Sequence, residues 1–237
     1  MATPGEWFQT IPPITRIWAT SCVATTVLSG MKFISLNSIY LSFTLVFKKF
    51  QLWRLITPFF YIDRFGFRFV MNLVFILSYS APLEKITYEH RTADYAFMLL
   101  FGMASLLPLA YLTSMYFTAI PLIFMALYVW SRYNPDANVS IWGVLKLKAF
   151  YLPWALLGLG FLLGHNPMND LAGILVGHLY YFLHVLHPRR TGKAILVTPQ
   201  WLRKALSDAG IGEVDPQFAR PTQGFRAFQG GGRRLAD

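Results

Sequence analysis

Long apolar stretches, separated by short polar segments, make up most of the first four-fifths of the chain. Six of them approach the length of a membrane-spanning helix, which needs about 20 mostly apolar residues. They cover residues 14–30, 67–83, 95–114, 116–131, 147–163 and 168–187. The pattern therefore predicts an all-α membrane protein with six transmembrane helices.

The first apolar stretch must be weighed against a cleaved signal peptide. Pro12 and Pro13 prevent an earlier helical start, and Arg16 is the only charge nearby, so the basic segment typical of a signal peptide is missing. We interpret the stretch as an uncleaved membrane helix. Several of the six stretches fall short of the usual span, which fits either a locally thinned bilayer or helix ends displaced by a few residues.

Composition limits the class of protein further. Hydrophobic residues make up 55% of the 237 residues and charged residues only 14%, which is too few charges for the surface of a soluble domain. The single cysteine, Cys22, excludes an internal disulfide and a cysteine-rich zinc site. A free-standing soluble domain and a largely disordered chain are therefore both excluded.

The net charge of +10 is unevenly distributed. Residues 1–188 carry twelve basic and seven acidic side chains, whereas residues 189–237 carry nine basic and four acidic ones. We divide the chain into a membrane domain, 1–188, and a flexible cytosolic tail, 189–237. Basic residues beside a membrane suit anionic lipid headgroups. No stacking platform or recognition helix accompanies them, so no nucleic-acid partner is expected.

Loop charges predict the orientation. An even number of spans places both termini on one side, and the loops on that side together with the basic tail carry most of the lysine and arginine residues, which favours cytosolic termini. The first loop, residues 31–66, is basic although it lies on the opposite side. It contains an apolar run, residues 40–50, that is too short to span. We predict an interfacial segment lying on the membrane.

Two short motifs indicate how the helices and loops are held. Trp53 and Arg54 are adjacent in the first loop, where the indole suits the headgroup region and the guanidinium can bind backbone carbonyls. Gly173 and Gly177 are four residues apart in the last span, so both lie on one helix face and allow another backbone to approach closely. For Trp53-Arg54 the alternative interpretation is a generic aromatic-belt position. For the two glycines it is ordinary helix packing.

Three polar residues interrupt the apolar spans and are candidates for lining a hydrated cavity. Asn72 lies in the second span, and Asn169 and Asp170 begin the last one. An interhelical hydrogen bond explains Asn72 equally well, and the helix dipole alone favours an acidic residue near a helix start. The histidines have no cysteine or acidic ligands at a metal-binding spacing, so no metal or other cofactor is expected.

Five segments together resemble the derlins, rhomboid-like pseudoproteases of the endoplasmic reticulum membrane. The resemblance covers about residues 5–202, and its segments are PPITR at 12–16, Trp53-Arg54, ADYAFMLLF at 93–101, YLPW at 151–154 and LVGHLY at 175–180. It implies a six-helix rhomboid-like fold and a non-catalytic role in endoplasmic-reticulum-associated degradation. In that process misfolded proteins return to the cytosol for destruction.

The same resemblance allows a test for proteolysis. Active rhomboids use a serine on the fourth span and a histidine three residues before the first glycine of the last span, because the hydroxyl needs a nearby base. By this resemblance the serine position falls near Pro121, and Asp170 stands at the histidine position. Residues 116–124 contain neither serine nor glycine, and Thr118 has no base beside it in sequence. We therefore expect no enzyme. An intramembrane serine protease and a small-solute channel or transporter remain the alternatives, and the paired charges or inverted repeats of a transporter are not visible.

The tail contains a predicted short helix near 199–209, ended by Gly210, and then a flexible linker. Its last segment, residues 228–235, resembles the SHP box that binds the AAA ATPase valosin-containing protein. The residues that match that motif are Phe228, Gly230, Gly232 and Leu235. The derlin resemblance further implies a membrane ubiquitin-ligase complex and misfolded clients as partners, and leaves a homo- or hetero-oligomer open.

Overall fold

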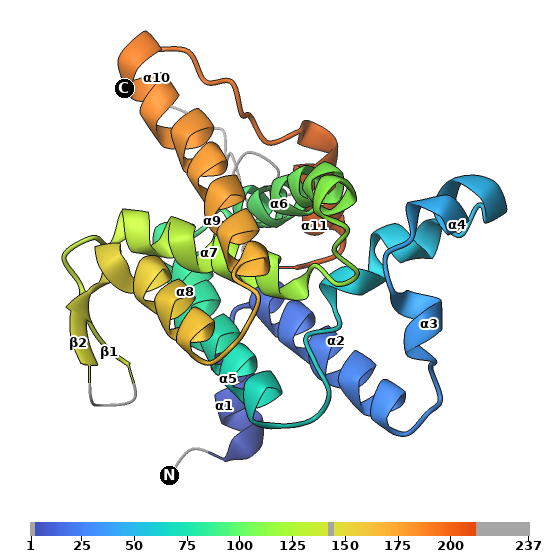
Figure 1. Cartoon of the computed structure of the whole chain (residues 1–237). Coiled ribbons are helices and arrows are strands. Elements are labelled where there is room, and N and C mark those ends of the chain that lie inside the picture. The colour runs from blue at the N-terminus through green and yellow to red at the C-terminus, as the bar shows by residue number, and fades with distance from the viewer. Residues whose placement is uncertain (1–2, 142–144, 212–237) are drawn as a thin grey trace, which may run out of the picture.

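Helices make up most of the computed structural model, which describes residues 3–141 and 145–211 (Figure 1). A helix lies in each of the six ranges that the sequence predicts as spans. These helices are α2 (Pro13–Gly30), α5 (Phe67–Phe75) with the π-helical turns η3 (Ile76–Ser80) and η4 (Leu83–Thr87), α6 (Thr92–Thr113), α7 (Ala119–Tyr133), α8 (Leu152–Leu162), and α9 (Met168–Tyr181) with the π-helical turn η6 (Phe182–Leu186) and α10 (His187–Thr191).

The six helices differ in their capacity to cross a membrane. Three segments are long and apolar enough by length and composition, namely Phe67–Thr87, Thr92–Thr113 and Met168–Thr191. Two further apolar helices, Ala119–Tyr133 and Ala149–Leu162, are shorter. At about 1.5 Å per residue, the 15 residues of α7 extend about 22 Å, against about 30 Å for a hydrocarbon core. A multi-pass membrane protein is confirmed, whereas six crossings remain a prediction.

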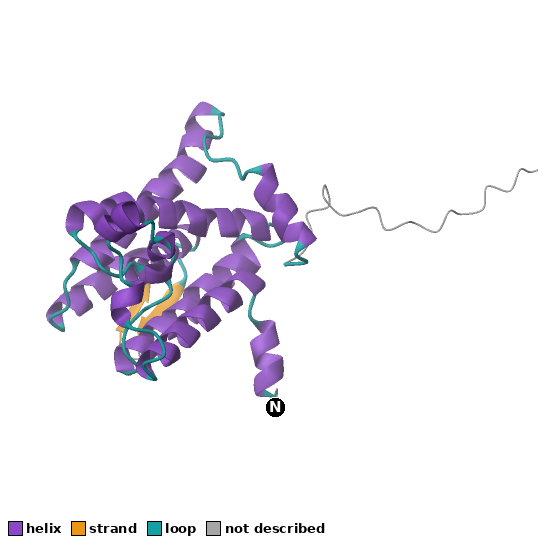
Figure 2. Ribbon diagram, turned by 90° about the vertical axis from the view of Figure 1, so that its right-hand side faces the viewer, coloured by secondary structure: helices purple, strands orange, loops and turns teal. Residues whose placement is uncertain are grey.

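A β-hairpin departs from the predicted all-α class. Strands β1 (Asn138–Ile141) and β2 (Leu145–Lys148) pair antiparallel, with Asn138 opposite Lys148 (Figures 1 and 2). In sequence, apolar and polar residues alternate in both segments, which is the period of a strand and not of a helix. The predicted start of the fifth span at residue 147 was therefore wrong. The 3-10 turn η5 (Ala149–Tyr151) precedes α8, which begins at Leu152.

Helix α7 forms the centre of the domain. Every residue from Ala119 to Val129 is buried, so the helix is covered on all sides by its neighbours. Figure 1 shows α7 packed between α8 and α9, with α5 and α6 behind it. A helix that is apolar around its whole circumference suits this position. The core that surrounds the candidate site is therefore built around α7.

A buried carboxylate holds the start of α2. Glu84, in η4, is 4% exposed and accepts hydrogen bonds from the backbone N–H groups of Ile14 (2.9 Å) and Thr15 (2.7 Å). The Thr15 hydroxyl donates to the same carboxylate at 2.7 Å and lies 3.2 Å from the hydroxyl of Tyr95 on α6. Since the first N–H groups of a helix lack partners within the helix, Glu84 satisfies two of them and joins α2 to the second span.

The first loop consists of short helical pieces with exposed aromatic side chains. These pieces are α3 (Leu36–Ile39), α4 (Phe43–Lys49) and the 3-10 turns η1 (Leu52–Leu55) and η2 (Thr57–Phe59). Phe47 and Phe50 are 74% and 79% exposed, and Lys48 and Lys49 lie beside them. Exposed aromatics next to lysines are what an interfacial segment requires.

Both ends of the described chain carry a short helix. At the amino end, α1 (Pro4–Thr10) precedes the two prolines at the start of α2. Near the other end, α11 (Gln200–Asp208) occupies the range predicted for the tail helix, and Gly210 follows it with a φ of +64°. In Figure 1, α11 lies beside α6. Leu202 on α11 is buried. The described part of the tail therefore packs against the membrane domain.

Candidate functional site

A cavity of about 360 Å³ lies between α5, α7, α8 and the start of α9. Asn72 on α5 and Asp170 on α9 both line it, and each is 7% exposed. Arg68 and His165 add two more polar side chains to the wall. The rest of the lining is mainly apolar, from Phe67, Met71, Phe75, Ile120, Phe124, Leu156, Leu159 and Leu163. The cavity is thus mainly apolar, with four polar side chains on its wall.

Asp170 is the acidic group of this cavity. It lies in the first turn of α9, where the helix dipole favours a carboxylate. Helix α8 passes close to it at Gly160, where an added Cβ would lie 3.3 Å from Oδ2 of Asp170 and 3.7 Å from Nδ1 of His165. A glycine there leaves room for the carboxylate.

The other two predicted cavity residues differ in position. Asn72 donates a 2.8 Å hydrogen bond from its side-chain amide to the carbonyl of Arg68, one turn earlier on α5. Asn169 is half-buried and is not among the residues that line this cavity. The structure thus brings Asn72 and Asp170 together, on two helices, and leaves Asn169 beside them.

The paired glycines of α9 face α7. A Cβ on Gly173 would overlap the carbonyl oxygen of Pro121 and lie 2.6 Å from Cβ of Phe124. A Cβ on Gly177 would lie 3.0 Å from Cβ of Tyr128. Both glycines are therefore required for the close approach of the two helices.

The surroundings of Pro121 hold no serine–histidine pair. Thr118 is fully buried, and its hydroxyl has no hydrogen-bonding partner within residues 3–141 and 145–211. On α9, His178 Nδ1 lies 2.8 Å from the hydroxyl of Tyr128, not from a serine or threonine. The described site therefore lacks the arrangement in which a base removes the proton from a serine or threonine hydroxyl.

Trp53 and Arg54 have different environments in the first loop. Trp53 is 52% exposed and donates from Nε1 to the carbonyl of Ser38 at 3.3 Å. Arg54 is only 6% exposed, donates from Nη1 to the carbonyl of Tyr40 at 3.0 Å, and lies 4.9 Å above the Tyr40 ring. The guanidinium therefore holds the loop backbone from inside, and only Trp53 is placed for contact with headgroups.

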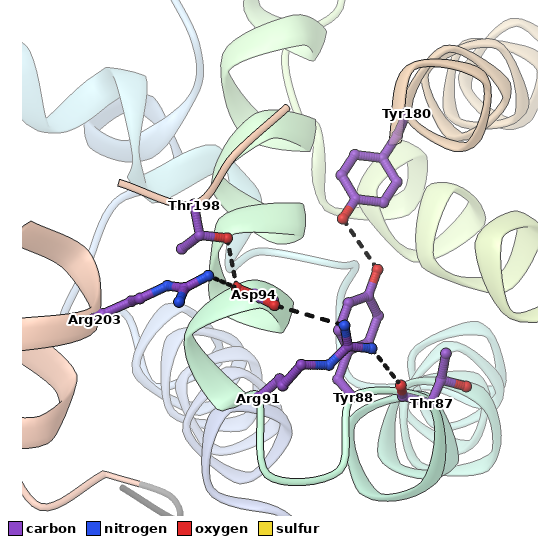
Figure 3. Close-up of polar contacts among 7 residues, drawn as sticks. All are labelled: Thr87, Tyr88, Arg91, Asp94, Tyr180, Thr198 and Arg203. Atoms are coloured by element: carbon purple, nitrogen blue, oxygen red, sulfur yellow. Dashed lines mark hydrogen bonds and ion pairs between the residues drawn. The ribbon is translucent and has the colours of Figure 1, made fainter. Parts of the chain in front are cut away.

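A second polar cluster, at the start of α6, was not predicted from the sequence (Figure 3). Asp94 accepts a 2.6 Å hydrogen bond from the hydroxyl of Thr198 and a 3.2 Å ion pair from Nη2 of Arg203. Arg91 lies 4.0 Å from the other carboxylate oxygen. Asp94 and Thr198 are 9% and 6% exposed. This Asp94 cluster fixes the tail helix to α6. The sequence could not predict it, because Thr198 and Arg203 lie more than a hundred positions after Asp94.

Tyrosines continue this cluster towards α9. The hydroxyls of Tyr88 and Tyr180 lie 3.0 Å apart. Figure 3 draws this contact between the two side chains. Burial raises the pKa of Tyr88 well above its ordinary value, so this phenol stays neutral and can donate or accept a hydrogen bond. The ring of Tyr180 also stacks on His184. His184 thus packs against an aromatic ring.

The predicted SHP-box residues lie outside the described part of the chain. Phe228, Gly230, Gly232 and Leu235 all fall within residues 212–237. Their predicted role is therefore carried by the sequence alone.

Comparison with known proteins identifies the family. The Der1-like family model matches residues 11–200. The chain is 43% identical to "Derlin-1.1" of Zea mays, over 99% of each chain, and 42% identical to "Derlin-1" of Oryza sativa subsp. japonica, over the whole of each. It is also 45% identical to "Derlin-1" of Arabidopsis thaliana, over 90% of this chain and 80% of that one. The chain therefore belongs to the Der1-like family.

Proposed function

We propose that the chain is a non-catalytic component of endoplasmic-reticulum-associated degradation that helps misfolded proteins return to the cytosol. The observation that carries this proposal is the cavity, bordered in part by short helices, in which a few polar side chains stand on an otherwise apolar wall. Each backbone polar group left without a partner in hydrocarbon costs several kcal/mol, so a polypeptide needs a polar or thinned path. Asn72, Asp170 and His165 offer polar partners, and the lipid-accessible helix α8 is short enough to favour a thin membrane.

The first loop supports the same proposal. Its exposed aromatic side chains, Phe47, Phe50 and Trp53, suit insertion at the edge of the bilayer. In this proposal the protein resides in the endoplasmic reticulum membrane with both termini in the cytosol. It acts without proteolysis, and a membrane ubiquitin-ligase complex receives the emerging client.

A photocross-linking experiment tests the role of the cavity. A photoreactive phenylalanine analogue at Phe75, which lines the cavity, is expected to cross-link a stalled misfolded client. The same analogue at Val70 is the matched control, because Val70 lies on the same helix, is 45% exposed and does not line the cavity. Equal cross-linking at both positions, or none at Phe75, would contradict passage through the cavity. Labelling of the purified protein by a serine-reactive probe would instead favour the protease alternative.

Recruitment of the ATPase is tested at the end of the tail. Replacing both Phe228 and Leu235 with alanine is expected to abolish co-purification of valosin-containing protein, because these side chains are the apolar anchors of the motif. The control is Gln229→Ala, which changes a neighbouring position that the motif leaves open. Co-purification that survives the double substitution would exclude the SHP assignment. It would leave the cavity result unaffected.

A further inference from the structure

The segment between α10 and the end of α11, residues 192–208, has an exposed apolar surface surrounded by basic residues. Ile195, Val197 and Trp201 are 54%, 62% and 65% exposed. Residues 189–211 carry five basic side chains and one acidic one, and four of the basic ones are exposed, namely Arg189, Arg190, Lys193 and Lys204. Side chains of this size are normally left in water only singly, so their grouping marks an interaction surface.

The Asp94 cluster orients this surface. On α11, Leu202 is buried and Arg203 points to Asp94, as Figure 3 shows for the arginine. A helix advances about 100° per residue, so Trp201 and Ala205 lie together on the flank opposite Arg203. Both are exposed. The ion pair thus neutralises one basic side chain inside the protein and turns an apolar flank outward.

The cluster also fixes the depth of α11. Asp94 lies in the first turn of α6, a helix long and apolar enough to span the bilayer. The first turn of a spanning helix lies near the boundary between hydrocarbon and headgroups. Since Thr198 and Arg203 both contact Asp94, α11 is held at that boundary, beside the end of the span (Figure 1).

We propose that this surface, residues 192–208, binds the anionic lipid headgroups of the membrane leaflet at the start of α6. Trp201, Ile195 and Val197 enter the interface, and the exposed basic residues attract the negative lipid charge. Charge complementarity favours a lipid surface as the occupant, because the bilayer in which the chain is embedded already lies at this depth. Asp94 acts as a positioning residue that keeps α11 in the plane of the interface.

The test uses the purified full-length chain in vesicles of phosphatidylcholine, with or without phosphatidylserine. An environment-sensitive dye is attached through Ala205→Cys, on the apolar flank, or through Gln200→Cys, on the exposed polar side. Cys22 is fully buried, and unsubstituted protein reports any labelling of it. We expect the emission of the dye at 205 to shift to shorter wavelength with phosphatidylserine and to return as salt is added. The dye at 200 should change little.

Charge variants distinguish the effect of this surface from the effect of the protein's overall net charge. Lys193→Glu with Lys204→Glu should abolish the effect of phosphatidylserine on the dye at 205. The matched control, Lys146→Glu with Lys148→Glu in β2, makes the same change in net charge and should preserve it. Asp94→Asn should reduce the difference between positions 205 and 200, since α11 loses its orientation.

Three results would overturn the proposal. The first is an emission that is the same in both kinds of vesicle. The second is an equal loss in the Lys146 and Lys148 control. The third is a shift that appears in detergent without phosphatidylserine and grows with protein concentration, which would assign the surface to a second copy of the chain. Because none of these measurements involves a client or the ATPase, the proposal is tested independently of the proposed function.

Discussion

Gly173→Ala is expected to destabilise the membrane domain, although it adds only one methyl group. The new Cβ would overlap the carbonyl oxygen of Pro121 and crowd Cβ of Phe124, and both belong to the central helix α7. Backbone atoms cannot move aside as a flexible side chain can. Overpacking of this kind typically destabilises a protein by about 1–3 kcal/mol. Because the backbones of both α7 and α9 would have to move, we expect a cost at the upper end of this range.

The matched control for this prediction is Gly158→Ala on α8. An added Cβ there meets no atom within 4 Å, and alanine favours a helix over glycine by about 1 kcal/mol. The two variants should therefore shift the thermal unfolding midpoint in detergent in opposite directions. If both raised it, the close packing of α7 and α9 would not limit stability.

Glu84→Ala is expected to be the most damaging change at the opposite end of the bundle. It would leave the N–H groups of Ile14 and Thr15 and the Thr15 hydroxyl without their carboxylate. A buried group without its partner costs about 1–3 kcal/mol, so the start of α2 should detach from the second span. Burial makes the loss larger, because water does not readily replace the missing bonds.

Cys22 provides a local measurement of this detachment. It lies on α2, is fully buried, and is the only cysteine of the chain. In Glu84→Ala it should react with a membrane-permeant thiol reagent much faster than in the parent protein. Glu89→Ala is the control, because the Glu89 side chain is 68% exposed and its loss should change nothing. Unchanged Cys22 reactivity in Glu84→Ala would show that α2 is held by packing alone.

The sequence predicts the helices well because long apolar stretches have few other stable forms in a membrane. It failed at β1 and β2, where alternation over four residues is a weak signal beside the strong apolar run that follows. The structure also showed that the π-helical turns η3 and η6 precede Pro82 and Pro188. A proline ring clashes with the preceding turn of a helix, and the wider π-helical turn relieves this clash. The helix therefore continues past each proline, and the hydrophobic pattern shows no break there.

At the candidate site, the sequence identified polar residues that are unusual in apolar spans. It could not identify which residues contact one another in the fold. Asn72 and Asp170 are conspicuous because polar residues are costly in a span, and both line the cavity. Glu84 looked like the charged end of a span, although it caps a helix seventy residues earlier. Asp94 and Thr198 look ordinary in sequence, and only the folded chain brings them together. Pairings at this separation need tertiary information.

The complete burial of α7 has a consequence for how the protein is made. A helix of 15 residues with no lipid-facing side is poorly suited to remain alone in a bilayer while synthesis continues. Its principal partner, α9, follows it by more than thirty residues, so the two helices cannot pair until that segment has left the ribosome. The insertion machinery or the earlier helices must shelter α7 during this interval. The fold therefore sets an order of assembly, in which the centre of the domain is completed last.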